Sequence, residues 1–168
     1  ILTLLLSFSK GFSQKSFTRA DTLRGSITPE RAWWDLNHYH LAVEIFPETK
    51  SIKGSNTIRY RVVSEYQVLQ LDLQEPLKIT SIKQAGEELS FKREGAVHFV
   101  TLKKKQVPGS MEELVVSYEG QPKEAIRPPW DGGITWTKDN NGKSFIASSN
   151  QGIGSSIWWP LKDHPADE

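Results

Sequence analysis

Apolar and polar side chains alternate with a period of two over most of the chain after Asn37. This period is typical of a half-buried β-strand, because successive side chains of a strand point to opposite faces. A first run reaches Ile45, a turn follows at 46–49, and a second alternating run covers 51–63. The two runs predict a long antiparallel hairpin. On one face of the first run lie Tyr39, Leu41, Val43 and Ile45, and on the other His38, His40, Ala42 and Glu44.

Shorter runs of the same kind predict further strands, separated by turn residues such as Ala85-Gly86 and Glu94-Gly95. The predicted strands cover 68–73, 79–84, 88–93, 96–102, a run with Leu114, Val116 and Tyr118, and finally 134–138 and 143–148. The last two flank Asn141-Gly142, the strongest hairpin-turn signal in the chain. No stretch has a sustained helical period. The sequence therefore predicts an all-β, mainly antiparallel domain of about ten strands, a large curved, saddle-like sheet or sandwich with few or no helices.

The amino-terminal part of the chain lacks this periodicity. Residues 1–6 are apolar but far too few to span a bilayer, and Gly11 and Ser13 suit positions −3 and −1 of a cleavage site. We interpret residues 1–13 as a truncated signal peptide and expect a fragment of an exported protein, whether periplasmic, outer-surface or secreted. The alternative is a stray apolar amino terminus.

Residues 14–34 are polar and basic, and they predict an extended arm with one short helical turn after Thr28-Pro29. Trp33 and Trp34 at its end are expected to dock on the sheet.

Composition excludes several classes of function. The net charge is +1, so no field of one sign indicates nucleic acid or anionic lipid as a partner. Cysteine is absent, which excludes disulfides, a thiolate zinc site and a catalytic thiol. Six tryptophans indicate either a well-packed β-core or a stacking surface for sugars.

No catalytic motif is present in these residues. The chain has no His-Glu-x-x-His zinc motif, no nucleophile elbow and no phosphate-binding loop. His38 and His40 share a strand face and could chelate a metal with a third ligand, but solvent-facing histidines are the better account because no partner has zinc-like spacing. We expect no catalytic or metal-binding residue here, and an inactive fragment.

The segment from Ser148 to Glu168 carries the most informative pattern. Trp158 and Trp159 run into Pro160, and Pro165 follows the charged trio 162–164. Proline cannot donate to a strand ladder, so the segment predicts a loop pinned by buried aromatic side chains. On the residues alone it is either a ligand-facing wall or a tryptophan-anchored connection between domains.

This segment resembles the end of the amino-terminal β-domain of zinc-dependent aminopeptidases of the aminopeptidase N and leukotriene hydrolase type, the gluzincin metallopeptidases. In that family a Thr-Gln-x-Glu or Thr-Gln-x-Gln element precedes an aromatic-Pro-Cys-x-Asp-x-Pro element by a fixed spacing. Gln151 lies nine positions before Pro160 and takes the last place of the first element. Asp163 and Pro165 also fit. The sequence departs from the pattern at Ser148, Ser149, Ser156 and Leu161, where the family usually has Thr, Gln, Arg and Cys.

The resemblance implies a bacterial exported member in which residues 35–168 form a C-terminally incomplete β-domain ahead of a helical catalytic domain. That missing domain would hold the zinc. Gln151 would hold the free α-amino group of a peptide substrate, as its amide oxygen can accept a hydrogen bond from an ammonium. The possible supporting loop residues are Asn150, Gly152, Trp158, Trp159 and Asp163.

Two further functions stay open on the sequence. The chain could be a secreted carbohydrate-binding or adhesive β-sandwich that stacks sugars on Trp130, Trp136, Trp158 and Trp159. It could also be a purely structural β-domain. Burial of those tryptophans would count against the first alternative, and exposed coplanar rings along a groove would favour it.

Overall fold

The computed structural model describes residues 16–164, so the predicted signal peptide lies outside the described residues. Two short helices, α1 (Arg19–Gly25) and α2 (Pro29–Ala32), precede the strands. The strands are β1 (Trp34–Phe46), β2 (Ser51–Val62), β3 (Val68–Asp72), β4 (Lys78–Gln84), β5 (Glu87–Glu88), β6 (Ser90–Glu94), β7 (Val97–Thr101), β8 (Met111–Gly120), β9 (Gly133–Lys138) and β10 (Ser144–Ser149). The short 3₁₀ turns η1 (Pro47–Thr49) and η2 (Ser155–Ile157) complete the set.

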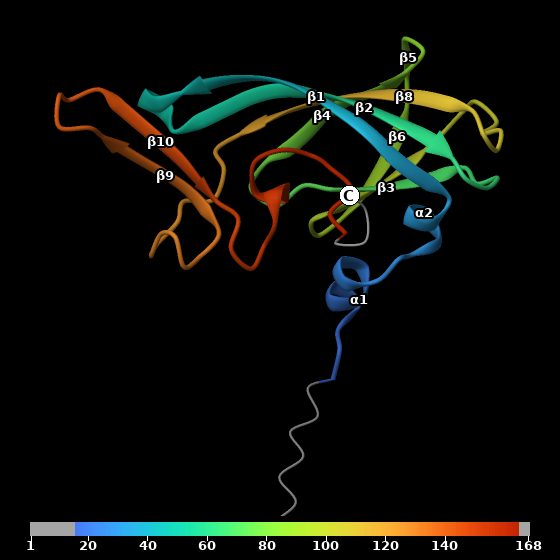
Figure 1. The fold of residues 1–168 in the computed structure, drawn as a ribbon, viewed down its shortest axis with the longest axis horizontal. Helices are drawn as coiled ribbons and strands as arrows, with labels where there is room; N and C mark the ends of the chain where they lie inside the picture. Colours follow the sequence, from blue (N-terminus) through green and yellow to red (C-terminus); the bar gives the residue numbers. More distant parts are fainter. Residues whose placement is uncertain (1–15, 165–168) are drawn as a thin grey trace, which may run out of the picture.

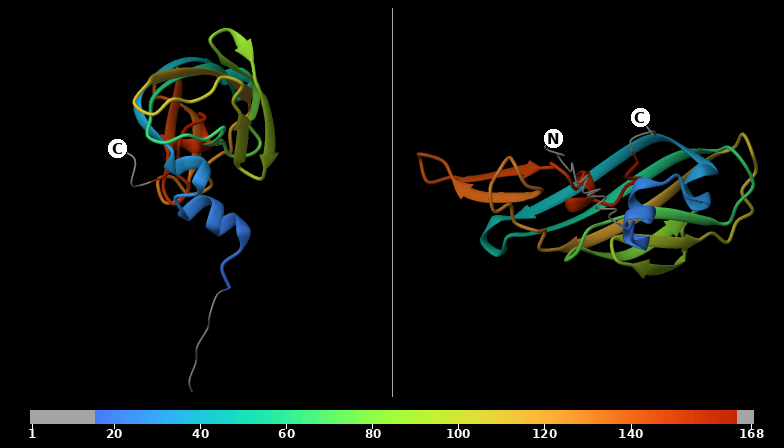
Figure 2. Two further views of the ribbon diagram at one scale, coloured as in Figure 1. Left: turned by 90° about the vertical axis from the view of Figure 1, so that its right-hand side faces the viewer. Right: turned by 90° about the horizontal axis from the view of Figure 1, so that it is seen from below.

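The strands form three antiparallel sheets. A five-stranded sheet has the order β1-β2-β8-β4-β5, a three-stranded sheet the order β3-β7-β6, and β9 and β10 pair as a separate hairpin. In Figure 1 the long strands β1, β2 and β8 arch over the molecule, and the β9–β10 hairpin projects at one end. Figure 2 shows the two larger sheets curving around a common interior. The predicted all-β, mainly antiparallel fold is confirmed.

The β1–β2 hairpin follows the predicted alternation. Tyr39, Leu41 and Val43 on the inner face of β1 are half-buried, whereas His38 and His40 on the other face are exposed. The pairing of β1 with β2 shifts register between Leu36 and His38, a bulge that β1 accommodates because it lies at the sheet edge. β1 begins at Trp34, three residues before the predicted start.

The core fills the space between the five-stranded and three-stranded sheets. Inward side chains of β2, β8 and β4 meet those of β3 and β7 there. Trp33 and Trp34 are fully buried, and both contact the Tyr60 ring edge-on at centroid distances of 5.8 and 5.5 Å. The predicted docking of these two tryptophans on the sheet is confirmed. The buried core side chains include Ile58, Val62, Leu69, Leu71, Ile82, Val100, Leu114, Val116 and Tyr118.

Within the arm predicted over 14–34, α2 begins at Pro29 and is the helical turn predicted after Thr28-Pro29. α1 was not predicted and replaces an extended chain there. The Thr18 side chain accepts from the Asp21 N–H and the Asp21 side chain accepts from the Thr18 N–H, a reciprocal capping box that starts α1. Only Leu23 of α1 is buried, so no apolar period marked the helix. The Thr18-x-x-Asp21 spacing was the available signal.

None of the helices among residues 16–164 has the length and hydropathy that a membrane span requires.

Candidate functional site

Gln151 lies at the tip of a tight turn, residues 150–154, that follows β10. The Asn150 carbonyl accepts hydrogen bonds from the N–H groups of Ile153 at 3.3 Å and Gly154 at 2.9 Å. Gly152 has φ of 73°, a conformation that glycine adopts without steric cost. The Gln151 side chain is exposed and makes no hydrogen bond to any residue among 16–164, so its amide is available to a ligand.

Three neighbouring segments brace this turn. The Asn150 side chain donates to Ser155 Oγ at 3.2 Å, and Ser149 Oγ donates to the Pro129 carbonyl at 2.8 Å. From α1, the Arg24 guanidinium donates to the Gly152 carbonyl. The turn is therefore held by η2, by the loop before β9 and by the amino-terminal helix.

Asp163 also supports this turn. Its carboxylate accepts a hydrogen bond from Ser156 Oγ at 2.7 Å, and Ser156 is fully buried. A Cβ added at Gly154 would lie 2.6 Å from Asp163 Oδ2, so the backbone passes directly against the carboxylate. Gly154 adopts φ 87° and ψ −179°, a region essentially restricted to glycine. Asp163 and Gly154 thus fit together as a pair.

Hydrogen bonds to its backbone anchor the segment that carries Asp163. Leu161 and Asp72 exchange N–H···O bonds of 2.8 and 3.1 Å at the end of β3. The buried Asn56 side chain donates to the Pro160 carbonyl at 2.8 Å, and Tyr39 Oη accepts from the Lys162 N–H at 2.9 Å. The predicted loop is therefore held by these hydrogen bonds as well as by its aromatic rings.

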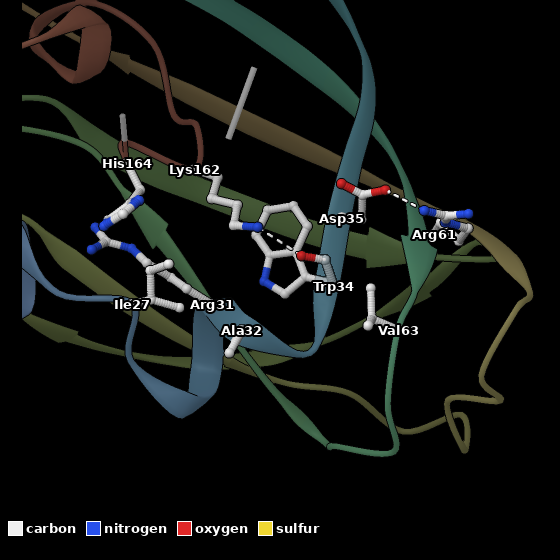
Figure 3. A pocket seen from close by; sticks show the side chains of 9 residues that line it. All are labelled: Ile27, Arg31, Ala32, Trp34, Asp35, Arg61, Val63, Lys162 and His164. Atoms are coloured by element: carbon white, nitrogen blue, oxygen red, sulfur yellow. Dashed lines mark hydrogen bonds and ion pairs between the residues drawn. The ribbon is translucent and has the colours of Figure 1, made fainter. Parts of the chain in front are cut away.

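Lys162 extends the anchor to the start of β1. Its ammonium donates to the Trp34 carbonyl at 2.6 Å and lies 4.5 Å from the Trp34 ring centroid, a cation–π contact. Figure 3 shows Lys162 reaching over Trp34, with Asp35 and Arg61 nearby. These residues line a cavity of about 380 Å³, and Asp35 and Arg61 form an ion pair at 2.9 Å. His164 also lines this cavity, which lies at the opposite end of the anchored segment from the Gln151 turn.

The tryptophans are arranged for packing. Trp159 meets Tyr39 at 4.8 Å and 84°, and Trp158 meets Trp159 at 6.0 Å and 64°, so these rings are edge-on and not coplanar. Trp136, Trp158 and Trp159 are partly buried against the core, and of the four candidate stacking residues Trp130 alone is largely exposed, at 80%. This geometry counts against the carbohydrate-binding alternative.

A buried ion pair lies next to the segment that carries Asp163. Arg31 Nη2 contacts Asp72 Oδ2 at 2.7 Å, and the same oxygen accepts the Asp163 N–H at 3.2 Å. Gln70 Nε2 donates to the other Asp72 oxygen at 3.3 Å. Burial raises the pKa of the Asp72 carboxyl, and Arg31, the Asp163 N–H and Gln70 each act against that shift.

Sequence reasoning did not identify Arg24, Arg31 or Asp72. The two arginines sit in an aperiodic basic segment, where a charged residue is ordinarily solvated. Asp72 interrupts an apolar strand, and a carboxylate flanked by Leu71 and Leu73 was the one available hint of a buried partner. Its partner could not be named because it lies 41 residues away.

The described residues do not fit a zinc ion. Among residues 16–164 no group of three or more His, Cys, Asp or Glu side chains could hold a metal. His38 and His40 stand on the exposed face of β1 without a third ligand in that part of the chain.

Comparison with known families decides what kind of domain this is. Residues 36–168 match the family model of the Peptidase M1 N-terminal domain. The chain belongs to the peptidase M1 N-terminal domain family. The resemblance to the amino-terminal domain of zinc-dependent aminopeptidases is thereby confirmed, and the match begins after the arm that carries α1 and α2.

Solved structures share the fold of this M1 domain. The M1 zinc metallopeptidase from Deinococcus radiodurans is 22% identical with a TM-score of 0.60 over 81% of this chain and 30% of its own. A mutant of the Deinococcus radiodurans enzyme, bound to a Tyr-Ser-Ala substrate, is 22% identical with a TM-score of 0.61 over 86% of this chain and 33% of its own. Yeast LTA4 hydrolase in complex with bestatin is 16% identical, with a TM-score of 0.64 over 80% of this chain and 21% of its own.

The chain spans about a third or less of the length of these structures. Their identity to this chain is low, so they establish the fold alone. A comparison with curated protein sequences finds no match.

Proposed function

We propose that this M1 domain is the non-catalytic β-domain of an exported zinc metallo-aminopeptidase, and that Gln151 binds the free α-amino group of peptide substrates. The observation that carries the proposal is the position of Gln151, in the family register before Pro160 and exposed at the tip of a braced turn. Export is inferred from the signal-like pattern of residues 1–13.

The chemistry assigned to Gln151 is orientation. A hydrogen bond from an ammonium to the amide oxygen contributes on the order of 1.5–3 kcal/mol, enough to align a substrate. An acylated amino terminus has no ammonium to donate and leaves this acceptor unpaired, so blocked peptides bind more weakly. Gln151 is neutral, so a carboxylate from the remainder of the protein would add the electrostatic attraction.

The remainder of the protein would supply the reaction centre. A zinc ion held by that remainder would supply Lewis-acid chemistry at the scissile carbonyl and at a bound water. The residues of this chain bind and align the amino end of the substrate. The Deinococcus radiodurans mutant is bound to a Tyr-Ser-Ala substrate, which supports peptides as the substrate class here.

The test compares free with N-acetylated aminoacyl anilides as substrates of the full-length protein. We expect zinc-dependent cleavage of the free form, with kcat/KM about 10- to 100-fold lower in Gln151→Ala, as expected for loss of a hydrogen bond to a charged group. The matched control is Asn140→Ala, which removes an amide from the exposed β9–β10 turn and is expected to leave kcat/KM unchanged.

Two results would overturn the proposal. Cleavage that persists after zinc removal would exclude a zinc metallo-aminopeptidase. A Gln151→Ala enzyme that keeps the full preference for the free amine would leave the domain a structural role only.

A further inference from the structure

The segment before the family match reaches the Gln151 turn directly. α1 ends beside the turn, and the Arg24 guanidinium donates to the carbonyl of Gly152, the residue after Gln151. Leu23, Arg24 and Ile153 line one cavity of about 460 Å³ together with Asp72 and Asp163. α1 and the turn therefore face each other across a shared space.

Arg31 holds α1 in this place. Its side chain has no exposed surface, and its Nη1 donates to the carbonyls of Leu23 at 2.7 Å, Arg24 at 3.2 Å and Ser26 at 3.0 Å. These carbonyls lie in the last turn of α1 and just after it, where no helical N–H is available to them. The Arg31 guanidinium thus caps the helix end from which the Arg24 side chain extends.

The same guanidinium is tied to the segment beneath the turn. Its Nη2 contacts Asp72 Oδ2 at 2.7 Å, and that oxygen also accepts the Asp163 N–H at 3.2 Å. Asp163 in turn lies against Gly154 at the end of the turn. One buried carboxylate therefore fixes both α1 and the base of the turn.

We propose that Arg24 is a positioning residue for Gln151, with Arg31 and Asp72 holding the helix from which it acts. Gly152 and Gly154 both have positive φ, and glycine leaves the turn many alternative conformations. A hydrogen bond to the Gly152 carbonyl restricts those conformations and directs the Gln151 amide. The assignment of a ligand to Gln151 rests on the proposed function, but the brace itself can be measured without it.

Hydrogen exchange of this 168-residue chain tests the brace. In Arg24→Ala we expect the Ile153 and Gly154 amides to exchange at least about threefold faster, as expected for loss of one exposed charge-assisted bond. The Thr22 and Ser26 amides, which bond within and at the end of α1, should keep their rates. Arg24→Lys retains a donor and should restore most of the protection.

Arg19→Ala is the matched control, because Arg19 lies on the same helix and pairs instead with Glu94. Unchanged exchange at Ile153 and Gly154 in Arg24→Ala would overturn the brace. If these two amides exchange equally faster in Arg24→Ala and Arg19→Ala, the cause is fraying of α1, and the role of Arg24 is overturned as well.

Kinetics of the full-length protein tests the positioning. Arg24→Ala should raise KM for a free aminoacyl anilide about 3- to 10-fold with kcat within about twofold, and Arg24→Lys should recover it. Faster exchange without a KM change would show a brace with no positioning role and would reject the proposal. If Gln151→Ala instead leaves amine preference intact while the exchange result holds, the proposed function fails and the brace stands.

Discussion

Gly154 and Asp163 form a fit that depends on the absence of a side chain. The Gly154 backbone has a glycine-only conformation, and the Asp163 carboxylate occupies the space where a Cβ would lie. The same carboxylate accepts the Ser156 hydroxyl hydrogen bond. A single methyl group at this position would therefore disturb both the turn and its support.

Gly154→Ala is expected to lower the free energy of unfolding by about 3 kcal/mol, from backbone strain and contact with Asp163. The measurement is urea unfolding followed by tryptophan fluorescence. Gly142→Ala is the control, because Gly142 also has positive φ, 78°, but has no atom within 4 Å of the added Cβ. We expect it to cost only about 1 kcal/mol. Equal losses in the two variants would contradict the close fit.

The side chains of both Arg31 and Asp72 are buried, so loss of the arginine cation leaves a buried carboxylate without a counter-charge. Arg31→Met is expected to cost about 3–5 kcal/mol of unfolding free energy. The double variant Arg31→Met with Asp72→Asn should cost less than the sum of the two single changes, because no lone charge remains. Denaturant unfolding of the four proteins gives the coupling energy, and strict additivity would refute the ion-pair interpretation.

At the scale of elements, one short stretch of the chain joins the two large sheets, because its two strands pair with strands of different sheets. The sequence predicted one strand over 88–93, but β5 pairs with β4 and β6 pairs with β7. Leu89 sits between them, 4% exposed, and belongs to the core cluster. The chain therefore crosses from one sheet to the other at a buried leucine.

Leu89→Ala is expected to lower the free energy of unfolding by about 2–5 kcal/mol, because the lost methyl groups leave a cavity where the sheets join. Ile126→Ala, at a position 82% exposed, should stay within about 0.5 kcal/mol of the wild type. Both are measured by urea unfolding. A loss below 1 kcal/mol for Leu89→Ala would show that the crossing is not part of the core.

At the scale of the whole molecule, pH couples to folding through a buried histidine. His98 on β7 is 1% exposed. Burial first, and then the neighbouring Arg93 charge, lower its pKa from 6.5 to about 4, against a smaller opposing effect of a backbone hydrogen bond at Ala96. The folded protein therefore excludes a proton that the unfolded chain binds.

Between pH 6.5 and about 4 the unfolded state binds this proton and the folded state does not, so stability falls as the pH falls through that window. The expected loss approaches about 3 kcal/mol and is absent above pH 7. His98→Gln should remove this part of the pH dependence, measured as unfolding free energy at several pH values. His40→Gln, exposed on β1, is the control. Parallel curves for wild type and His98→Gln would contradict the assignment.

Much of the fold was predictable because its signals are local. Alternation with a period of two, the Asn141-Gly142 turn and Pro47 after the first run are read from neighbouring residues, and they gave the β1–β2 and β9–β10 hairpins. α1 was missed because it buries one leucine and has no apolar face to show. The β5–β6 break was missed because Leu89 faces a core built from distant strands.

The sequence by itself determined most of the strand pattern and the nine-residue spacing between Gln151 and Pro160, since each depends on residues close together in the chain. It also carried the family resemblance that the match over residues 36–168 confirms. The tertiary structure alone decided what holds Gln151 in place. Arg24 and Gly152 are 128 residues apart, and Asp72 and Asp163 are 91 apart. Such contacts arise only when the sheets pack and bring these segments together, so no local pattern could encode them.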